Sequence, residues 1–217
     1  KRRQVQRRRR ERQGIAHAAI VGYTNAGKSS LLNALTGADV LVENQLFATL
    51  DPTTRQMLLP NRQPLLLTDT VGFIRKLPHD LVAAFQATLE EAALADFLVN
   101  VVDLASPWCE EHWATTIQVL TELGAGDRPV LTVLNKADLA ADPVLQARMR
   151  ALHPDAVLVS ARTGAGLEEL RARLMAMARD ESAILHLRLP PERHDLAALA
   201  HRLGRVLAAE YDDTGHL

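Results

Sequence analysis

The sequence lacks the cysteine pairs, long apolar runs and metal-ligand spacings that mark secreted, membrane-spanning and zinc-binding proteins. Cys109 is its only cysteine, so no disulfide can form within the chain. No uninterrupted apolar run approaches the roughly 20 residues that span a bilayer. The basic start has no apolar core after it, which argues against a secretion signal. The eight histidines lack metal-ligand spacing. A cytoplasmic protein is therefore the expectation.

The chain has the composition of a folded domain and an uneven distribution of charge. Apolar residues make up 47% of its 217 residues, enough for a substantial core. The net charge of −1 conceals eight Lys or Arg residues within residues 1–12, which leaves 17 basic and 25 acidic residues in the remainder. Residues 1–13 are either a contact for RNA phosphates or the solvated end of a connecting helix, two compatible interpretations. The start at Lys1 inside this segment predicts a piece of a longer protein.

The stretch Gly22-Tyr23-Thr24-Asn25-Ala26-Gly27-Lys28-Ser29 has the spacing G-x-x-x-x-G-K-S. The apolar run 18–21 before it favours a buried strand, and residues 30–35 after it favour a helix. In this context backbone N–H groups converge on nucleotide phosphates, Lys28 adds a full charge, and the Ser29 hydroxyl ligates Mg²⁺. We predict a phosphate-binding loop whose ligand contacts come from Gly22, Asn25, Ala26, Gly27, Lys28, Ser29 and Ser30.

The polar, proline-containing residues 46–55 predict a loop after the first helix. A nucleotide switch needs a threonine there, whose hydroxyl completes the magnesium shell only while the γ-phosphate is present. Thr49, Thr53 and Thr54 all have this chemistry, and spacing alone does not choose among them.

The apolar residues 65–67 and Thr68 predict a strand that ends in Asp69-Thr70-Val71-Gly72. Asp69, at the end of a buried strand, can hold Mg²⁺ through water, and Gly72 can offer its backbone N–H to the γ-phosphate. Phe73 follows where a glutamine would orient the attacking water, and its ring cannot do so by hydrogen bonding.

Two further motifs follow predicted strands at 130–134 and 156–159. The carboxylate of Asp138 can accept hydrogen bonds from the ring N–H and exocyclic amine of guanine, which adenine does not offer in that geometry. Asn135 would tie loops together, the Lys136 stem would lie over the base, and the N–H of Ala161 would meet the guanine carbonyl. The predicted base site comprises Asn135, Lys136, Asp138, Ser160, Ala161 and Arg162.

Strands alternate with helices along most of the chain, the further strand being expected at 97–103 and the further helices at 77–94, 108–123 and 166–177. This order predicts an α/β fold, a three-layer αβα sandwich around a mostly parallel sheet with ligand at the carboxyl ends of its strands. Residues 184–189 alternate like a strand and 194–210 have helical spacing. They predict the truncated start of a C-terminal α+β appendage.

The ordered set of phosphate loop, threonine loop, D-T-V-G, N-K-A-D and S-A-R resembles the P-loop GTPases over about residues 15–180. The longer strings G-Y-T-N-A-G-K-S-S, Q-L-F-A-T-L-D-P-T-T-R and D-T-V-G-F-I-R-K-L-P-H-D-L-V-A-A-F resemble the HflX family of translational GTPases, within the Obg–HflX branch. The resemblance implies the P-loop NTPase fold and a Mg²⁺-dependent GTP hydrolase that binds the large ribosomal subunit and its RNA. It also implies that bacterial members separate stalled or idle ribosomes.

The same resemblance implies residue roles and domain bounds. Thr49 becomes the switch threonine, Phe73 matches the branch's apolar replacement of glutamine, and Asn25 stands where potassium-stimulated relatives coordinate K⁺. The bounds are a basic linker-helix end at 1–13, a GTPase domain at 14–181 and the start of a small C-terminal domain at 182–217. We expect a monomer that binds GTP and GDP and turns over slowly, with Lys28, Thr49 and Gly72 as catalytic groups.

Two other functions are compatible with parts of the pattern. One is a ribosome-binding module latched by GTP, in which hydrolysis serves only for release. The other is an ATP-using kinase, which shares the phosphate loop, but Asp138 disfavours it because adenine cannot satisfy that carboxylate.

Overall fold

The structure is a computed structural model that describes residues 15–37, 53–73, 92–179, 186–190, 193–203, 206 and 208–210. Thr49, the basic segment 1–13 and most of the helix expected at 77–94 lie outside the described residues. The chain divides into two compact units, His17–Ala178 and the residues on either side of it. The predicted domain bounds at 13/14 and 181/182 stay predictions. Among the described residues no helix has the length and apolar character to cross a membrane.

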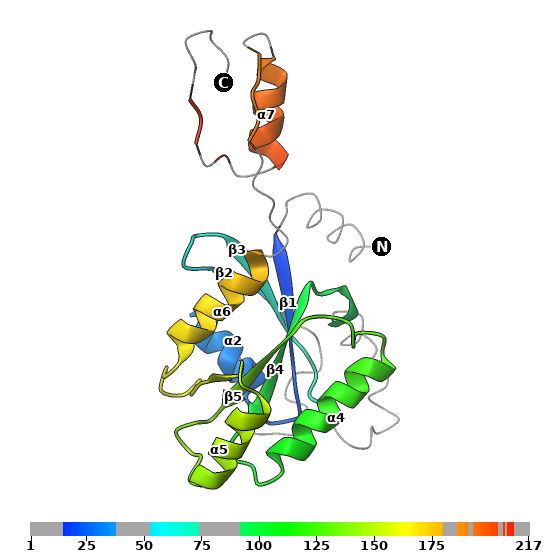
Figure 1. Cartoon of the computed structure of the whole chain (residues 1–217), viewed down its shortest axis with the longest axis vertical. Coiled ribbons are helices and arrows are strands. Elements are labelled where there is room, and N and C mark those ends of the chain that lie inside the picture. The colour runs from blue at the N-terminus through cyan, green and yellow to red at the C-terminus, as the bar shows by residue number, and fades with distance from the viewer. Residues whose placement is uncertain are drawn as a thin grey trace. The chain divides into compact units, whose positions relative to one another are not determined.

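Six strands form one sheet in the order β2-β3-β1-β4-β5-β6, with β1 in its interior (Figure 1). Neighbours β1 and β4, β4 and β5, and β5 and β6 run parallel, whereas β2 and β3 run antiparallel. The strands span Ala16–Val21 (β1), Thr53–Leu58 (β2), Pro64–Asp69 (β3), Phe97–Asp103 (β4), Val130–Asn135 (β5) and Val157–Leu158 (β6).

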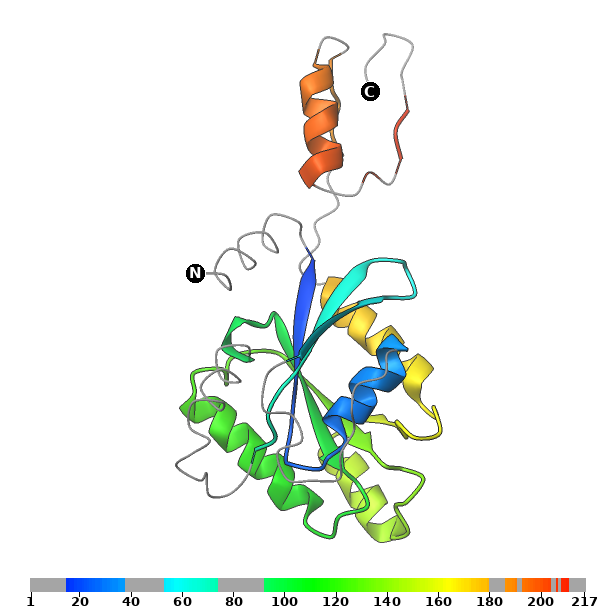
Figure 2. The same ribbon diagram turned by 180° about the vertical axis from the view of Figure 1, so that it is seen from behind.

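Helices cover both faces of the sheet, and Figures 1 and 2 show α2 and α6 on one side with α4 on the other. A hydrogen bond from Arg171 Nη2 to Ala34 O (3.4 Å) joins α6 to α2. The rings of Trp113 on α4 and His153 at the end of α5 lie 4.4 Å apart. These helices span Lys28–Thr36 (α2), Cys109–Glu122 (α4), Pro143–Leu152 (α5) and Leu167–Arg179 (α6). The three-layer α/β prediction is confirmed.

The burial of the central strands on both faces accounts for their largely apolar sequences. Six of the seven residues of β4 are buried, as expected of a parallel strand covered on both faces. Leu98 packs with Val21 and Phe73 in one cluster, and Val102 packs with Met149 of α5 in another. This packing gives the loops at the strand ends a rigid base.

The hairpin of β2 and β3 corrects the loop expected over residues 46–55. Thr53, Thr54 and Arg55 belong to β2 and pair with β3. Threonine is β-branched and suits a strand once a partner is available, and the edge of β3 supplies that partner. The hydroxyls of Thr54 and Thr68 lie 2.8 Å apart, which commits Thr54 to the hairpin.

The C-terminal elements are shorter than their patterns predict. His186–Leu189 are described and form no strand, because alternation needs a partner strand and none pairs with them in the described part of the chain. Helix α7 spans His194–Leu203 instead of 194–210, and the described residues 206 and 208–210 are not helical. Gly204 follows α7 in the sequence, and glycine is the commonest residue just past a helix end.

Helix α5 was not expected from the apolar pattern, yet its start has clear signals. The Asp142 carboxylate caps it by accepting hydrogen bonds from the N–H groups of Val144 (2.9 Å) and Leu145 (3.2 Å). Pro143 occupies the first turn, where its missing N–H costs nothing. An Asp-Pro pair before Val144 and Leu145 is the pattern from which this helix could have been found.

The cap makes a stability prediction. Asp142→Ala should lower the free energy of unfolding by about 1 kcal/mol, because two amide groups of α5 lose their acceptor. Asp142→Asn should retain most of the stability, since its amide oxygen can accept the same bonds. Urea unfolding of the three proteins measures this, and equal losses in both variants would contradict the capping role.

Candidate nucleotide-binding site

The phosphate loop, the D-T-V-G segment, N-K-A-D and S-A-R each follow the carboxyl end of a sheet strand, β1, β3, β5 and β6 respectively. The chain leaves β3 on one side of β1 and later enters β4 on its other side, so the strand order reverses at β1. In open α/β sheets, ligands bind outside the carboxyl ends of the strands at such a point. The fold therefore places the phosphate loop, which follows β1, at the centre of the candidate site (Figure 1).

The phosphate loop has a backbone that requires glycine at both ends. Gly22 has φ 142°, and a Cβ there would lie 2.3 Å from the carbonyl oxygen of Val101. Gly27 has φ 91°, and a Cβ there would lie 2.4 Å from Asn135 Nδ2. Gly27 is also the N-cap of α2, with no side-chain hydrogen bond at the cap. The first amides of α2 are thus left for an anion.

Lys28 is the buried cation of this loop. The residue is 6% exposed, and its Nζ donates a hydrogen bond to the carbonyl oxygen of Tyr23 (3.1 Å). Burial lowers the pKa of Lys28 to about 8, with a smaller opposing effect from the carboxylate of Asp69. A phosphate group would stabilise the charged ammonium by giving it an anionic partner, and so raise this pKa again.

The D-T-V-G segment lies directly against the phosphate loop. The N–H of Thr24 donates to Phe73 O (2.9 Å), and the N–H of Phe73 donates to Gly22 O (3.0 Å). A Cβ on Gly72 would lie 2.9 Å from Lys28 Nζ, so glycine allows this backbone to approach the ammonium. Gly72 and Lys28, predicted to act on the same phosphate, are therefore neighbours.

Ser29 and Asp69 form an oxygen pair that fits Mg²⁺. The Ser29 hydroxyl donates to Asp69 Oδ2 at 2.6 Å, and Asp69 is fully buried. Mg²⁺ prefers oxygen ligands and keeps several waters, usually with one or two carboxylates and substrate phosphates. No group of three or more His, Cys, Asp or Glu side chains that could hold a metal occurs in the described residues. A magnesium ion here would accordingly depend on nucleotide phosphates and water.

The side chain of Phe73 belongs to the hydrophobic core. Its side chain is fully buried and packs with Val21 and Leu98 in the core. The ring thus extends into the protein interior, and the position contributes only backbone groups to the loop.

Asn135 joins the phosphate loop to the S-A-R loop. Its Nδ2 donates to the carbonyl oxygen of Ala26 (2.9 Å), and its Oδ1 accepts the N–H of Ala161 (3.1 Å). Asn135 is 1% exposed, so both bonds are shielded from water. Because the Ala161 N–H already donates to Asn135, its contact with a guanine carbonyl stays a prediction.

Asp138 is held as an ionised acceptor. Its Oδ1 accepts the Ser160 hydroxyl at 2.6 Å, and its Oδ2 pairs with Arg162 Nη2 at 2.6 Å. The pKa of Asp138 is lowered, chiefly by the hydrogen bond from Ser160. A carboxylate has about four acceptor positions, so lone pairs remain for the two donors of a guanine ring.

Two contacts at the site were not predicted. Lys136 Nζ pairs with Asp103 Oδ2 at 2.7 Å, at the carboxyl end of β4. The ring of Tyr23 stacks on His112 of α4, with centroids 3.8 Å apart and planes inclined by 8°. The sequence could have indicated Asp103 as a site residue, because it is an acidic residue at the end of a buried strand. No spacing in the sequence indicates the contact between Tyr23 and His112.

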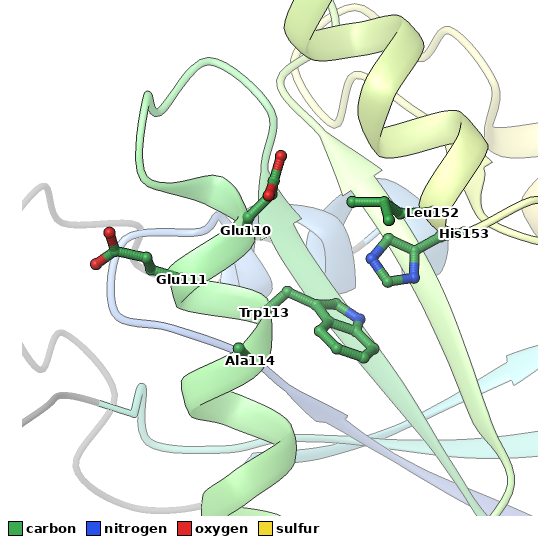
Figure 3. A pocket seen from close by; sticks show the side chains of 6 residues that line it. All are labelled: Glu110, Glu111, Trp113, Ala114, Leu152 and His153. Carbon is green, nitrogen blue, oxygen red and sulfur yellow. The ribbon is translucent and has the colours of Figure 1, made fainter.

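A separate hollow of about 500 Å³ lies between α4 and the end of α5 (Figure 3). Its Glu110 carboxylate is already paired with Arg148 Nε (2.7 Å), and Figure 3 shows Glu111 directed away from Trp113 and His153. No phosphate or base motif residue is among those that line it, which are Glu110, Glu111, Trp113, Ala114, Leu152 and His153. The nucleotide motifs point to the strand ends instead.

Solved structures of nucleotide-bound proteins share this fold. A GTP-binding protein from Sulfolobus solfataricus in complex with GDP is 31% identical, with a TM-score of 0.63 over 83% of this chain and 58% of that chain. A point variant of Era from Aquifex aeolicus bound to GDP·AlF4⁻ is 26% identical, with a TM-score of 0.62 over 82% of this chain and 60% of that chain.

Curated relatives match almost the whole chain. A GTPase HflX from Akkermansia muciniphila is 50% identical over 99% of this chain and 50% of that protein. GTPase HflX proteins from Lacrimispora saccharolytica and Chlamydia pneumoniae are 45% and 47% identical, each over 98% of this chain, and are covered over 50% and 45% of their own lengths. The chain thus spans about half the length of these relatives.

The lowered pKa of Lys28 predicts a pH dependence of GDP binding. With a pKa of about 8 in the nucleotide-free protein, the charged fraction of Lys28 should fall from about nine-tenths at pH 7 to about one-tenth at pH 9. The association constant for GDP should therefore fall about tenfold over this range. Titrations of Lys28→Met at the same pH values serve as the control, because they show how much of the change comes from ionisation of the guanine base itself. The same pH profile in that variant would contradict the role of Lys28.

The family model described as 50S ribosome-binding GTPase matches residues 17–136, from the first strand to the Lys of N-K-A-D. This range contains the phosphate loop, the Ser29–Asp69 pair and Asn135, all brought together by the fold. Together with the similarity to GTPase HflX proteins over nearly all of its length, the match shows that this chain belongs to the HflX family of P-loop GTPases.

Proposed function

We propose that this chain binds Mg²⁺–GTP at the strand ends and hydrolyses it slowly to GDP and phosphate, as the switch of a ribosome-associated protein. The observation that carries the proposal is the double hydrogen bond of Asn135, which holds the phosphate loop and the base loop at one site. Membership of a GTPase family supports a guanine nucleotide as the ligand. The ionised carboxylate of Asp138 also supports it, because it can accept hydrogen bonds from guanine.

Each residue then has a defined task in phosphoryl transfer. The ammonium of Lys28 and the first amides of α2 bind and orient the phosphates, and the nearby Gly72 N–H meets the γ-phosphate. Ser29 would hold the magnesium ion directly and Asp69 through water, with Thr49 completing the shell in the GTP state. When bound, this ion neutralises the charge that develops on the phosphate oxygens. Catalysis is then mainly electrostatic and positional.

Slow turnover follows from Phe73. Its buried ring leaves this position without the glutamine that would orient the attacking water. We propose that K⁺ beside Asn25 or the large ribosomal subunit accelerates the reaction. Asn25 has φ 60°, a left-handed conformation that asparagine tolerates, and stands within the phosphate loop.

The ribosomal role concerns the whole protein, and this chain spans about half the length of the relatives that it matches. We propose binding to the large subunit and its RNA, and splitting or recycling of ribosomes, by a monomer in the cytoplasm. The family description names 50S ribosome binding, which supports the partner. In the alternative, GTP latches the protein on the ribosome and hydrolysis only drives its release.

The test is GTP hydrolysis by this chain and its full-length parent, with and without large ribosomal subunits, in K⁺ and in Na⁺. We expect slow turnover of the chain alone, faster turnover in K⁺, at most weak stimulation of the chain by subunits, and strong stimulation of the parent.

Asp138→Asn should weaken GTP binding by roughly 100-fold or more, because an amide repels one of the two guanine donors. Equal competition by ATP, or fast single-turnover hydrolysis without K⁺, would contradict the proposal.

A non-hydrolysable GTP analogue separates the two ribosomal roles. One round of subunit separation by the full-length protein with the analogue, and repeated rounds with GTP, indicates that hydrolysis resets the switch. Repeated rounds with the analogue would show that hydrolysis is dispensable.

A further inference from the structure

Asp103 is an acidic residue at the nucleotide site that none of the motifs includes. It ends β4, and its Oδ2 pairs with Lys136 Nζ at 2.7 Å, the two side chains being 20% and 30% exposed. Its Oδ1 accepts the N–H of Ala105 at 3.0 Å, which fixes the carboxylate relative to its own loop. Both oxygens are thus engaged, one on each side of the group.

The sheet brings this carboxylate to Lys136 by register. Asp103 is the cross-strand partner of Asn135, and the N–H of Leu104 donates to Asn135 O at 2.9 Å. Lys136 therefore leaves the end of β5 beside the end of β4. Its φ of 61° is unusual for a residue with a long side chain, so the backbone is committed to this turn.

The Lys136 stem lies near Gly27, the last glycine of the phosphate loop, and its ammonium pairs with Asp103. A Cβ built on Gly27 would lie 3.9 Å from Lys136 Cε, within van der Waals distance. The aliphatic chain thus passes close to the last glycine of the loop, and the ammonium ends at the carboxylate of Asp103. Two ends of the side chain are fixed, one by the backbone turn and one by the ion pair.

Fixing the far end matters because lysine is flexible. A free lysine side chain loses more rotamer entropy than most other side chains when it is ordered. A stem that is already ordered before the base arrives saves that cost at binding, which is the general advantage of preorganisation. A partly buried ion pair of fixed geometry is better suited to this than a fully solvated pair, which contributes little.

We propose that Asp103 is a positioning residue of the guanine site, which holds the Lys136 stem ready to cover the base and so slows the release of guanine nucleotides. The inference rests on the proposed function, because it assumes that Lys136 lies over a bound guanine. The effect is the same for GDP and GTP, since the stem covers the base that both nucleotides share.

The test is the dissociation rate of a fluorescent GDP, measured by stopped flow with Asp103→Asn. Asparagine keeps the shape and the oxygen that accepts the Ala105 N–H, and removes only the charge that holds Lys136. We expect dissociation about tenfold faster, the size of one lost hydrogen bond between charged groups. Asp127→Asn, an exposed change in the loop after α4, is the matched charge control and should leave the rate unchanged.

A double-mutant cycle with Lys136→Met shows whether Asp103 acts through Lys136. Methionine keeps an apolar stem without the ammonium, so Asp103→Asn should change the rate less than twofold in that background. A full tenfold effect in the Lys136→Met background, or an unchanged rate in Asp103→Asn alone, would overturn the inference. Thermal unfolding of both variants without nucleotide shows whether they keep the fold. If Asp103→Asn unfolded the protein, Asp103 would be a structural residue and the inference would be overturned.

GDP binding by the unaltered chain distinguishes a failure of this inference from a failure of the proposed function. If the unaltered chain binds no GDP, the proposed function fails and the inference fails with it. If it binds GDP and Asp103→Asn releases it at the same rate, the inference alone fails.

Discussion

The candidate site depends on one side chain, the amide of Asn135, which bonds to two loops at once. Its Nδ2 holds Ala26 O in the phosphate loop, and its Oδ1 holds the Ala161 N–H in the loop after β6. These loops are far apart in sequence, so no local propensity could align them. At 1% exposure, each bond is worth more than at the surface, because a buried amide without partners costs about 1–3 kcal/mol. The phosphate site and the base site are in this way a single rigid unit.

Two charged groups of the site, Lys28 and Asp138, differ in how the protein treats their charge. Burial brings the pKa of Lys28 down from 10.5 to about 8, so the unfolded chain binds the proton more tightly than the folded one. The buried ammonium consequently costs stability at neutral pH, and this cost falls as the pH rises from about 8 to 10.5. An anionic phosphate offsets the same cost by giving the ammonium a partner. Asp138, in contrast, has a lowered pKa because Ser160 donates to it, which stabilises its acceptor form.

The sequence predicts most of the fold and the motif residues because their signals are local. Strand β4 has the predicted bounds 97–103, since a largely apolar run, interrupted only by Asn100, has a clear limit at Asp103. Pairing is not local, and for that reason Thr53 and Thr54 proved to be part of a hairpin and His186–Leu189 formed no strand. The ion pair of Asp103 with Lys136 depends on the register of β4 and β5, which a single sequence does not encode in any spacing.

The central claim is that one Mg²⁺–guanine nucleotide connects Lys28, Ser29 and Asp138 through the loops that Asn135 joins. A crystal structure of the chain grown with GDP and Mg²⁺ tests it most directly. We expect the β-phosphate within hydrogen-bond distance of Lys28 Nζ, the magnesium ion on Ser29 Oγ, and the guanine ring N–H on the carboxylate of Asp138. A nucleotide bound in the hollow between α4 and α5, or Asp138 turned away from the base, would contradict it.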